Sequence, residues 1–146
     1  MDELVQSMKK ALADTFAFYL KAHGFHWNVE GRTFLQDHEL FGNIYEEVYG
    51  SLDKFAEEIR TMDAYAPASF ARFSELTTIE DEIKILNAQG MLEKLLADNS
   101  IVMASVEQAY ELSEAAHNHG LSNFLAERQD AHAKHAWMLR ATLKQR

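Results

Sequence analysis

Residues 33–62 read TFLQDHELFGNIYEEVYGSLDKFAEEIRTM, and apolar side chains recur through them at the 3.6-residue period of an α-helix. The predicted stripe consists of Phe34, His38, Phe41, Tyr45, Val48, Leu52, Phe55, Ile59 and Met62. Thr33 and Gln36 match a capping box at the start of the helix. The helix is expected to end before Pro67, because the residue ahead of a proline disfavours helical geometry.

This helix carries three candidate metal ligands, His38, Asp53 and Glu57, and a fourth, His26, precedes it. Asp53 and Glu57 are four residues apart, so they project from one face of the helix. His38 lies fifteen residues before Asp53, which at 1.5 Å per residue separates them by roughly 22 Å. No metal ion spans that distance. If the four residues share a site, a second subunit must run antiparallel and contribute its own half.

The rest of the chain predicts three more long helices. The first has an apolar stripe and stops near Glu30-Gly31; the stripe consists of Leu4, Met8, Leu12, Phe16, Tyr19, His23 and Trp27. The third is expected at 88–117 and the fourth at 121–145, with His117-Asn118-His119-Gly120 between them. Residues 64–87 form one long connection, in which Ser69-Phe70-Ala71-Arg72-Phe73 predicts a short helix with exposed aromatic side chains.

A short link joins the first helix to the second and the third helix to the fourth, whereas a long link joins the second to the third. These link lengths are typical of one fold class. They predict an all-α, ferritin-like four-helix bundle whose long crossover contains a short extra helix. At 146 residues, with no internal repeat or linker, the sequence predicts a single domain over residues 1–146.

Composition excludes several classes of function. The absence of cysteine rules out disulfides, thiolate metal sites and thiol catalysis. A net charge of −9 disfavours binding to a nucleic-acid backbone and suits a surface that attracts cations. The start, Met1-Asp2-Glu3, lacks the pattern of a signal peptide, and no apolar run is long enough to cross a bilayer, so a cytoplasmic protein is expected.

Each candidate ligand also has a purely structural interpretation. His26 could cap a helix end, His38 could be a hydrogen-bonded core histidine, and Asp53 and Glu57 could lie on a solvated face. Together the four favour a metal site more strongly than any one does. Imidazole and carboxylate ligands suit iron, manganese or zinc. Trp27 is expected to be core packing, with a role in taking up oxidising equivalents as the alternative.

Three other spacings resemble metal motifs. His23-x-x-His26 and His132-x-x-His135 each place two imidazoles one turn apart, and the second pair is expected to be structural because no suitable acidic residue lies nearby in sequence. Glu114-x-x-His117 matches one element of an intrachain di-iron bundle, which needs two such elements, so that centre is not expected. Glu46-Glu47 and Glu80-Asp81-Glu82 are interpreted as solvated faces.

Four stretches of the sequence resemble the Dps miniferritins, the DNA-binding proteins from starved cells. They are Lys21-Ala22-His23-Gly24-Phe25-His26-Trp27-Asn28-Val29-Glu30-Gly31, Phe34-x-x-x-His38-Glu39-x-Phe41, Asp53-x-x-Ala56-Glu57-Glu58-Ile59-Arg60 and His135-Ala136-Trp137-Met138-Leu139-Arg140-Ala141. The resemblance covers almost the whole chain. The His-Trp…His…Asp-x-x-x-Glu spacing is its most specific part.

The resemblance implies a hollow dodecamer that oxidises Fe(II) at ferroxidase centres across a two-fold interface, usually with hydrogen peroxide, and stores ferric mineral inside. His26 and His38 of one subunit, with Asp53 and Glu57 of its neighbour, are then the implied metal ligands and catalytic residues. The implied partners are a second copy, Fe(II), and hydrogen peroxide or oxygen. The implied function is an iron-storing ferroxidase that protects against oxidative damage.

Two features depart from the family pattern. The family usually has an acidic residue four positions after the second histidine, where this sequence has Gly42, which predicts one firm iron site per centre and a weak second one. Members that coat DNA often use a Lys-rich tail, whereas this sequence starts Met1-Asp2-Glu3 and ends Lys144-Gln145-Arg146, so DNA binding is not expected. The alternatives are a shell with weakened or lost ferroxidase activity that acts as a structural or metal- or DNA-binding cage, a nucleoid-compacting protein, and a zinc or manganese cage.

Overall fold

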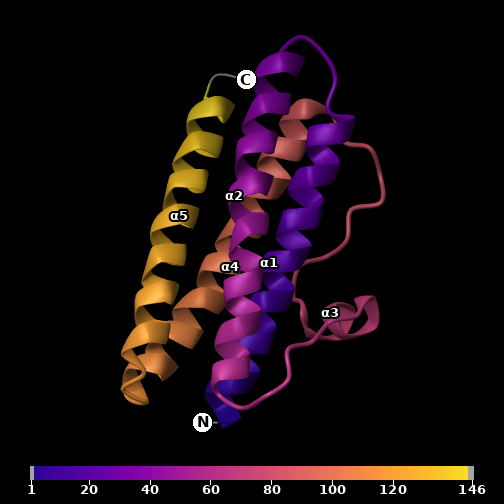
Figure 1. The fold of residues 1–146 in the computed structure, drawn as a ribbon. Helices are drawn as coiled ribbons and strands as arrows, with labels where there is room; N and C mark the ends of the chain where they lie inside the picture. The colour runs from indigo at the N-terminus through magenta and orange to yellow at the C-terminus, as the bar shows by residue number, and fades with distance from the viewer. Residues whose placement is uncertain (1, 145–146) are drawn as a thin grey trace.

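The computed structural model describes residues 2–144 and places in them four long helices and a short one, with no strand. The helices are α1 (Asp2–Asn28), α2 (Phe34–Thr61), α3 (Phe70–Leu76), α4 (Ala88–Ala115) and α5 (His119–Leu143). Figure 1 shows α1 and α2 as one antiparallel hairpin and α4 and α5 as the other, with the crossover and α3 on the α1 side. The predicted all-α bundle with a long crossover is therefore confirmed.

The helix ends follow from local sequence, with some corrections. Asn118 Oδ1 accepts from the Leu121 N–H, so α5 begins at His119, and His119 and Gly120 are helical rather than part of the predicted separator. At the end of α4, His117 adopts a positive φ of 56°, and the Asn118 N–H donates to the Ser113 carbonyl. That pattern is a Schellman motif in which histidine takes the position usually given to glycine.

The predicted capping box at the start of α2 is wrong. Thr33 precedes the helix but its side chain makes no capping hydrogen bond to a backbone N–H. Instead, Thr33 Oγ1 donates to Asp37 Oδ2 at 2.7 Å, because the buried Asp37 carboxylate lies one turn further on and competes for the hydroxyl. The predicted end of α2 before Pro67 and the short helix after Ser69 are confirmed. The predicted fourth-helix end at residue 145, like Gln145 and Arg146, lies outside the described residues.

The predicted stripe of α1 is right at its start and wrong at its end. Leu4, Met8 and Leu12 are buried, whereas Trp27 is 60% exposed. Four residues advance about 400° around a helix of 3.6 residues per turn, so a stripe with nearly that spacing drifts away from the core. The buried row continues instead through Phe18, Ala22 and Phe25. The drift turns Trp27 outward and leaves His23 and His26 half-buried at the edge of the bundle.

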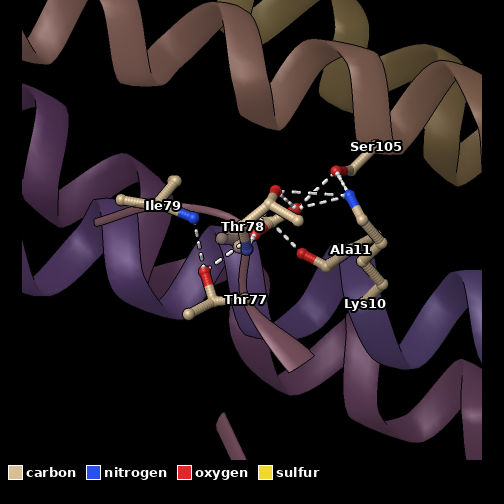
Figure 2. Close-up of polar contacts among 8 residues, drawn as sticks. Lys10, Ala11, Thr77, Thr78, Ile79 and Ser105 are labelled. Carbon is tan, nitrogen blue, oxygen red and sulfur yellow. Dashed lines mark hydrogen bonds and ion pairs between the residues drawn. The ribbon is translucent and has the colours of Figure 1, made fainter. Parts of the chain in front are cut away.

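A buried carboxylate fastens the long crossover to the bundle. Asp14 of α1 has no exposed surface and accepts hydrogen bonds from Thr77 Oγ1 at 2.7 Å and the Thr78 N–H at 2.6 Å. Ser105 Oγ of α4 also donates to it, and Lys10 Nζ lies 3.0 Å from Oδ2 (Figure 2). One side chain therefore joins α1, α4 and the crossover at a single point.

Candidate metal centre

His26 and His38 lie against one another where α1 ends and α2 begins. Their rings are stacked, with centroids 3.7 Å apart and planes within 15° of parallel. His26 Nδ1 lies 2.7 Å from the His38 carbonyl oxygen, and His38 Nδ1 lies 2.6 Å from the His26 carbonyl oxygen. The His26 carbonyl is in the last turn of α1, where it has no intrahelical partner, so the His38 ring satisfies it.

These reciprocal hydrogen bonds fix the tautomer of both rings. A carbonyl oxygen only accepts, so each Nδ1 must carry the proton and donate it. In the neutral rings each Nε2 is then left with a free lone pair. Metal-binding histidines are commonly oriented in this way, through a hydrogen bond from the other ring nitrogen to a backbone carbonyl. The pair is therefore prepared to offer two imidazole nitrogens to a cation.

Gly42 makes room for this arrangement. A Cβ atom at position 42 would lie 3.1 Å from both Cε1 and Nδ1 of His26, which is closer than ordinary packing allows. The missing side chain thus has a structural reason that the sequence did not show. Its absence lets the His26 ring lie directly against α2.

Changing Gly42 to alanine is expected to weaken Fe(II) binding severalfold, because the added methyl group displaces the His26 ring and disturbs both Nδ1 hydrogen bonds. Helix stability should change by no more than about 1 kcal/mol, the usual difference between glycine and alanine. Anaerobic calorimetric titration with Fe(II) measures the affinity. Gly24→Ala is the matched control, since a Cβ there meets nothing within 4 Å. Equal affinities in the two variants would contradict this account of Gly42.

Asp53 and Glu57 lie on the other half of α2, and both side chains are exposed. They occupy successive turns of one continuous helix that also contains His38. Asp53 borders an open apolar groove of about 840 Å³ between α1, α2 and α3, whose walls include Leu12, Phe16 and Phe73.

A single chain brings together one half of the predicted site but not the whole. Within residues 2–144, no cluster of three or more histidine, cysteine or acidic side chains has metal-binding geometry. The structure pairs His26 with His38 and leaves Asp53 and Glu57 further along α2.

Aromatic rings surround the histidine pair. The His23 ring stacks on Tyr45 with centroids 3.7 Å apart and lies 4.2 Å from Trp27, while Tyr45 lies 5.2 Å from His26. Burial is the main reason that the pKa of His23 lies below its usual value, with His26 adding to the shift. His23 is therefore a packed neighbour of the pair, with its own hydrogen bond to Tyr19.

The second histidine pair belongs to a network inside the bundle. His132 is buried, with Nδ1 2.8 Å from Asn99 Oδ1 and Nε2 2.8 Å from an Arg128 guanidinium nitrogen. Both ring nitrogens are thus engaged, and burial followed by the Arg128 charge lowers the His132 pKa well below its usual value. His135 does have an acidic partner, Glu47, which α2 supplies at 2.8 Å.

Glu46 and Glu47 are both exposed, as the interpretation of a solvated face expects, but Glu47 also has partners on α5. The Arg128 guanidinium binds both of its carboxylate oxygens. Burial alone would raise the pKa of Glu47, but His135 and Arg128 outweigh it and hold the pKa well below its usual range. The spacing of charges along α2 and α5 does not show which turns of the two helices face one another. The pairing of Glu47 with Arg128 and His135 could therefore be identified only from the structure.

Glu114 and His117 lie in different surroundings. Glu114 accepts hydrogen bonds from Tyr110 and Ser122, and His117 lies exposed in the turn after α4.

Among the described residues, no helix is long and apolar enough to span a membrane.

Comparison with known proteins gives consistent relatives. A family model described as the ferritin-like domain matches residues 5–146. "DNA protection during starvation protein 2" of Bacillus anthracis is 29% identical over 143 residues, covering 98% of each chain. The structure of Dps from Thermosynechococcus elongatus superposes with a TM-score of 0.95 at 23% identity, over 99% of this chain and 92% of that one.

A third relative is Dps from Vibrio cholerae O1, described as a member of a broad superfamily of ferritin-like diiron-carboxylate proteins. It is 26% identical, with a TM-score of 0.93, over 98% of this chain and 90% of its own.

Proposed function

Because this chain belongs to the ferritin-like family, and within it to the Dps miniferritins, we propose that it oxidises Fe(II) with hydrogen peroxide at centres shared between two subunits. The ferric product is stored inside a hollow dodecamer in the cytoplasm. Iron storage and protection from oxidative damage are general functions of the family. For this chain we further propose that His26, His38, Asp53 and Glu57 carry out the oxidation and that hydrogen peroxide is the oxidant.

The observation that carries the proposal is the stacked His26–His38 pair. Its two Nδ1 atoms are held by backbone carbonyls, and its two Nε2 atoms remain available as ligands. A structural histidine inside the same bundle looks different, because His132 uses both ring nitrogens in hydrogen bonds. The pair therefore has the form of a half-site that lacks its anionic ligands.

Asp53 and Glu57 of a second copy supply those ligands in the proposal. They and His38 lie on one unbroken helix, and fifteen residues separate His38 from Asp53 by roughly 22 Å. An antiparallel pairing of two α2 helices brings His38 of each copy to the carboxylates of the other. A two-fold pairing makes both sites at once, since each contact in such an interface occurs twice.

The iron ion is the substrate of this reaction. Two carboxylates are hard anionic ligands suited to Fe(II), and the imidazoles complete a more open coordination. The missing carboxylate at Gly42 leaves one firm iron position per centre and a weak second one in the proposal.

One alternative is a shell of the same architecture without efficient oxidation, and Gly42 is the feature that favours it. Following peroxide-driven formation of ferric iron by its absorbance separates the two possibilities. Rapid oxidation by the wild-type protein, with peroxide consumed in step and few hydroxyl radicals trapped, supports the ferroxidase. A rate equal to that of Fe(II) in buffer leaves only the shell.

A further inference from the structure

A continuous row of aromatic rings leads from the histidine pair along the face between α1 and α2. We call this row the aromatic ladder; it comprises Phe16, Tyr19, His23, Trp27, Tyr45 and Tyr49. Neighbouring centroids are 3.7–6.3 Å apart. Tyr45 connects the ladder to His26, at 5.2 Å.

Within the aromatic ladder, Tyr19 and His23 form the one side-chain hydrogen bond among the described residues. The Tyr19 hydroxyl lies 3.0 Å from His23 Nδ1, one helical turn away, which is within the reach that proton transfer needs. Burial, followed by the nearby Tyr49 and Tyr45 hydroxyls, raises the pKa of Tyr19. The phenol therefore keeps its proton at neutral pH, so its one-electron oxidation has to release that proton to a base. His23 Nδ1 is in place to accept it.

The chemistry proposed at the iron centre creates a need for such a donor. Reduction of hydrogen peroxide to water takes two electrons, whereas one Fe(II) supplies one. With Gly42 in place of an acidic ligand, a single firmly bound Fe(II) is the expected starting state. A second electron has to arrive quickly if a hydroxyl radical is not to be released.

We propose that Tyr19 and His23 act as a proton-coupled electron donor, giving the second electron to peroxide at the centre formed by His26 and His38. The inference rests on the proposed function and adds a redox role for residues that bind no iron. The electron passes through the stacked His23 and Tyr45 rings to His26.

The step balances in atoms and charge. Fe(II), the Tyr19 phenol, neutral His23, one hydrogen peroxide and two protons give Fe(III), a Tyr19 phenoxyl radical, protonated His23 and two waters. The O–O bond breaks, and the Tyr19 O–H proton moves to His23 Nδ1. A second Fe(II) then reduces the radical, and His23 returns the proton. The net reaction oxidises two Fe(II) for each peroxide.

Freeze-quench electron paramagnetic resonance tests the inference. Protein loaded with one Fe(II) per centre is mixed with one equivalent of hydrogen peroxide, and hydroxyl radicals are spin-trapped in parallel. The wild type is expected to show a transient tyrosyl signal and a low trap yield. Tyr19→Phe, which keeps the ring and removes the hydroxyl, is expected to lose the signal and raise the trap yield severalfold.

Tyr110→Phe is the matched control. Tyr110 also donates to an acceptor four residues on, Glu114, at 3.0 Å, but it lies on α4 outside the ladder. It should keep the wild-type signal and trap yield. Unchanged Fe(II) binding and circular dichroism in Tyr19→Phe show that the variant is intact.

The outcomes separate the two proposals. Rapid Fe(II) oxidation with no tyrosyl signal, or with the same signal in Tyr19→Phe, overturns the inference and leaves the ferroxidase standing. A radical on Trp27 that is independent of Tyr19 does the same. If the wild type oxidises no Fe(II), both proposals fail.

Discussion

Replacing Asp53 with alanine is expected to lower the rate of peroxide-driven Fe(II) oxidation at least about 100-fold. Even residues that merely orient metal ligands are commonly worth 10–100-fold in affinity or activity, and a proposed ligand should be worth more. In the single chain Asp53 is exposed, so the change should alter the free energy of unfolding by less than about 0.5 kcal/mol. Stopped-flow absorbance and urea denaturation measure the two effects.

Glu58→Ala is the control for this prediction. Glu58 is next to the other proposed ligand but pairs with Lys54 on the same helix, at 3.1 Å. Losing that pair should cost less than about 1 kcal/mol and leave the oxidation rate unchanged. A rate for Asp53→Ala within twofold of the rate for Glu58→Ala would remove Asp53 from the site.

Replacing Asp14 with alanine is expected to lower the free energy of unfolding by about 3–5 kcal/mol, the usual cost of removing one partner from a buried charged pair. The change leaves the Thr78 N–H and the Ser105 hydroxyl without their acceptor and releases the crossover from α1. Urea denaturation of wild type and variant should be followed at one protein concentration, because association contributes to stability. Glu58→Ala again provides the comparison, as a pair of the same i,i+4 type in which the Lys54 side chain is 56% exposed and the Glu58 side chain 12%.

The pH dependence of this difference has a definite sign. Burial alone would raise the pKa of Asp14, but hydrogen bonds from Ser105, Thr78, Thr77 and Lys10 outweigh it and hold the pKa below the ordinary 3.8. A carboxyl whose pKa is lowered by folding stabilises the protein above its unfolded pKa and loses that contribution as pH falls through the folded pKa. The gap between wild type and Asp14→Ala should therefore be constant above about pH 5 and shrink below pH 3.8. A gap that widens on acidification, or a loss below 1 kcal/mol at pH 7, would mean that Asp14 does not fasten the crossover.

The sequence predicted the helices well because their signals are local. The long apolar period of α2, Pro67 after it and the polar start at Ser69 depend on residues within a few turns of each other. The exposure of Trp27 was missed because a spacing close to four residues drifts around the helix. That error was geometric, and a strict 3.6-residue period would have avoided it.

Contacts between segments that are far apart in the sequence could not be predicted from the sequence. The family resemblance implied that His26 and His38 of one subunit belong to the same half of the site, but not that each ring binds the other's backbone carbonyl. In the sequence, Gly42 suggested that a metal ligand had been lost, whereas in the structure the backbone at position 42 lies close to the His26 ring. Glu47 with Arg128, and Asp14 with the crossover, join segments 81 and 63–64 residues apart. No local pattern encodes such pairings.

A subunit-mixing experiment tests most directly whether the centre is built from two copies. One variant carries His26→Ala and His38→Ala, the other carries Asp53→Ala and Glu57→Ala, and each alone should oxidise Fe(II) no faster than buffer. Co-assembled in equal amounts, half of the two-fold pairs are mixed and each mixed pair holds one intact site, so about a quarter of wild-type activity should return. A mixture that forms mixed pairs yet stays as inactive as its components would contradict a shared centre.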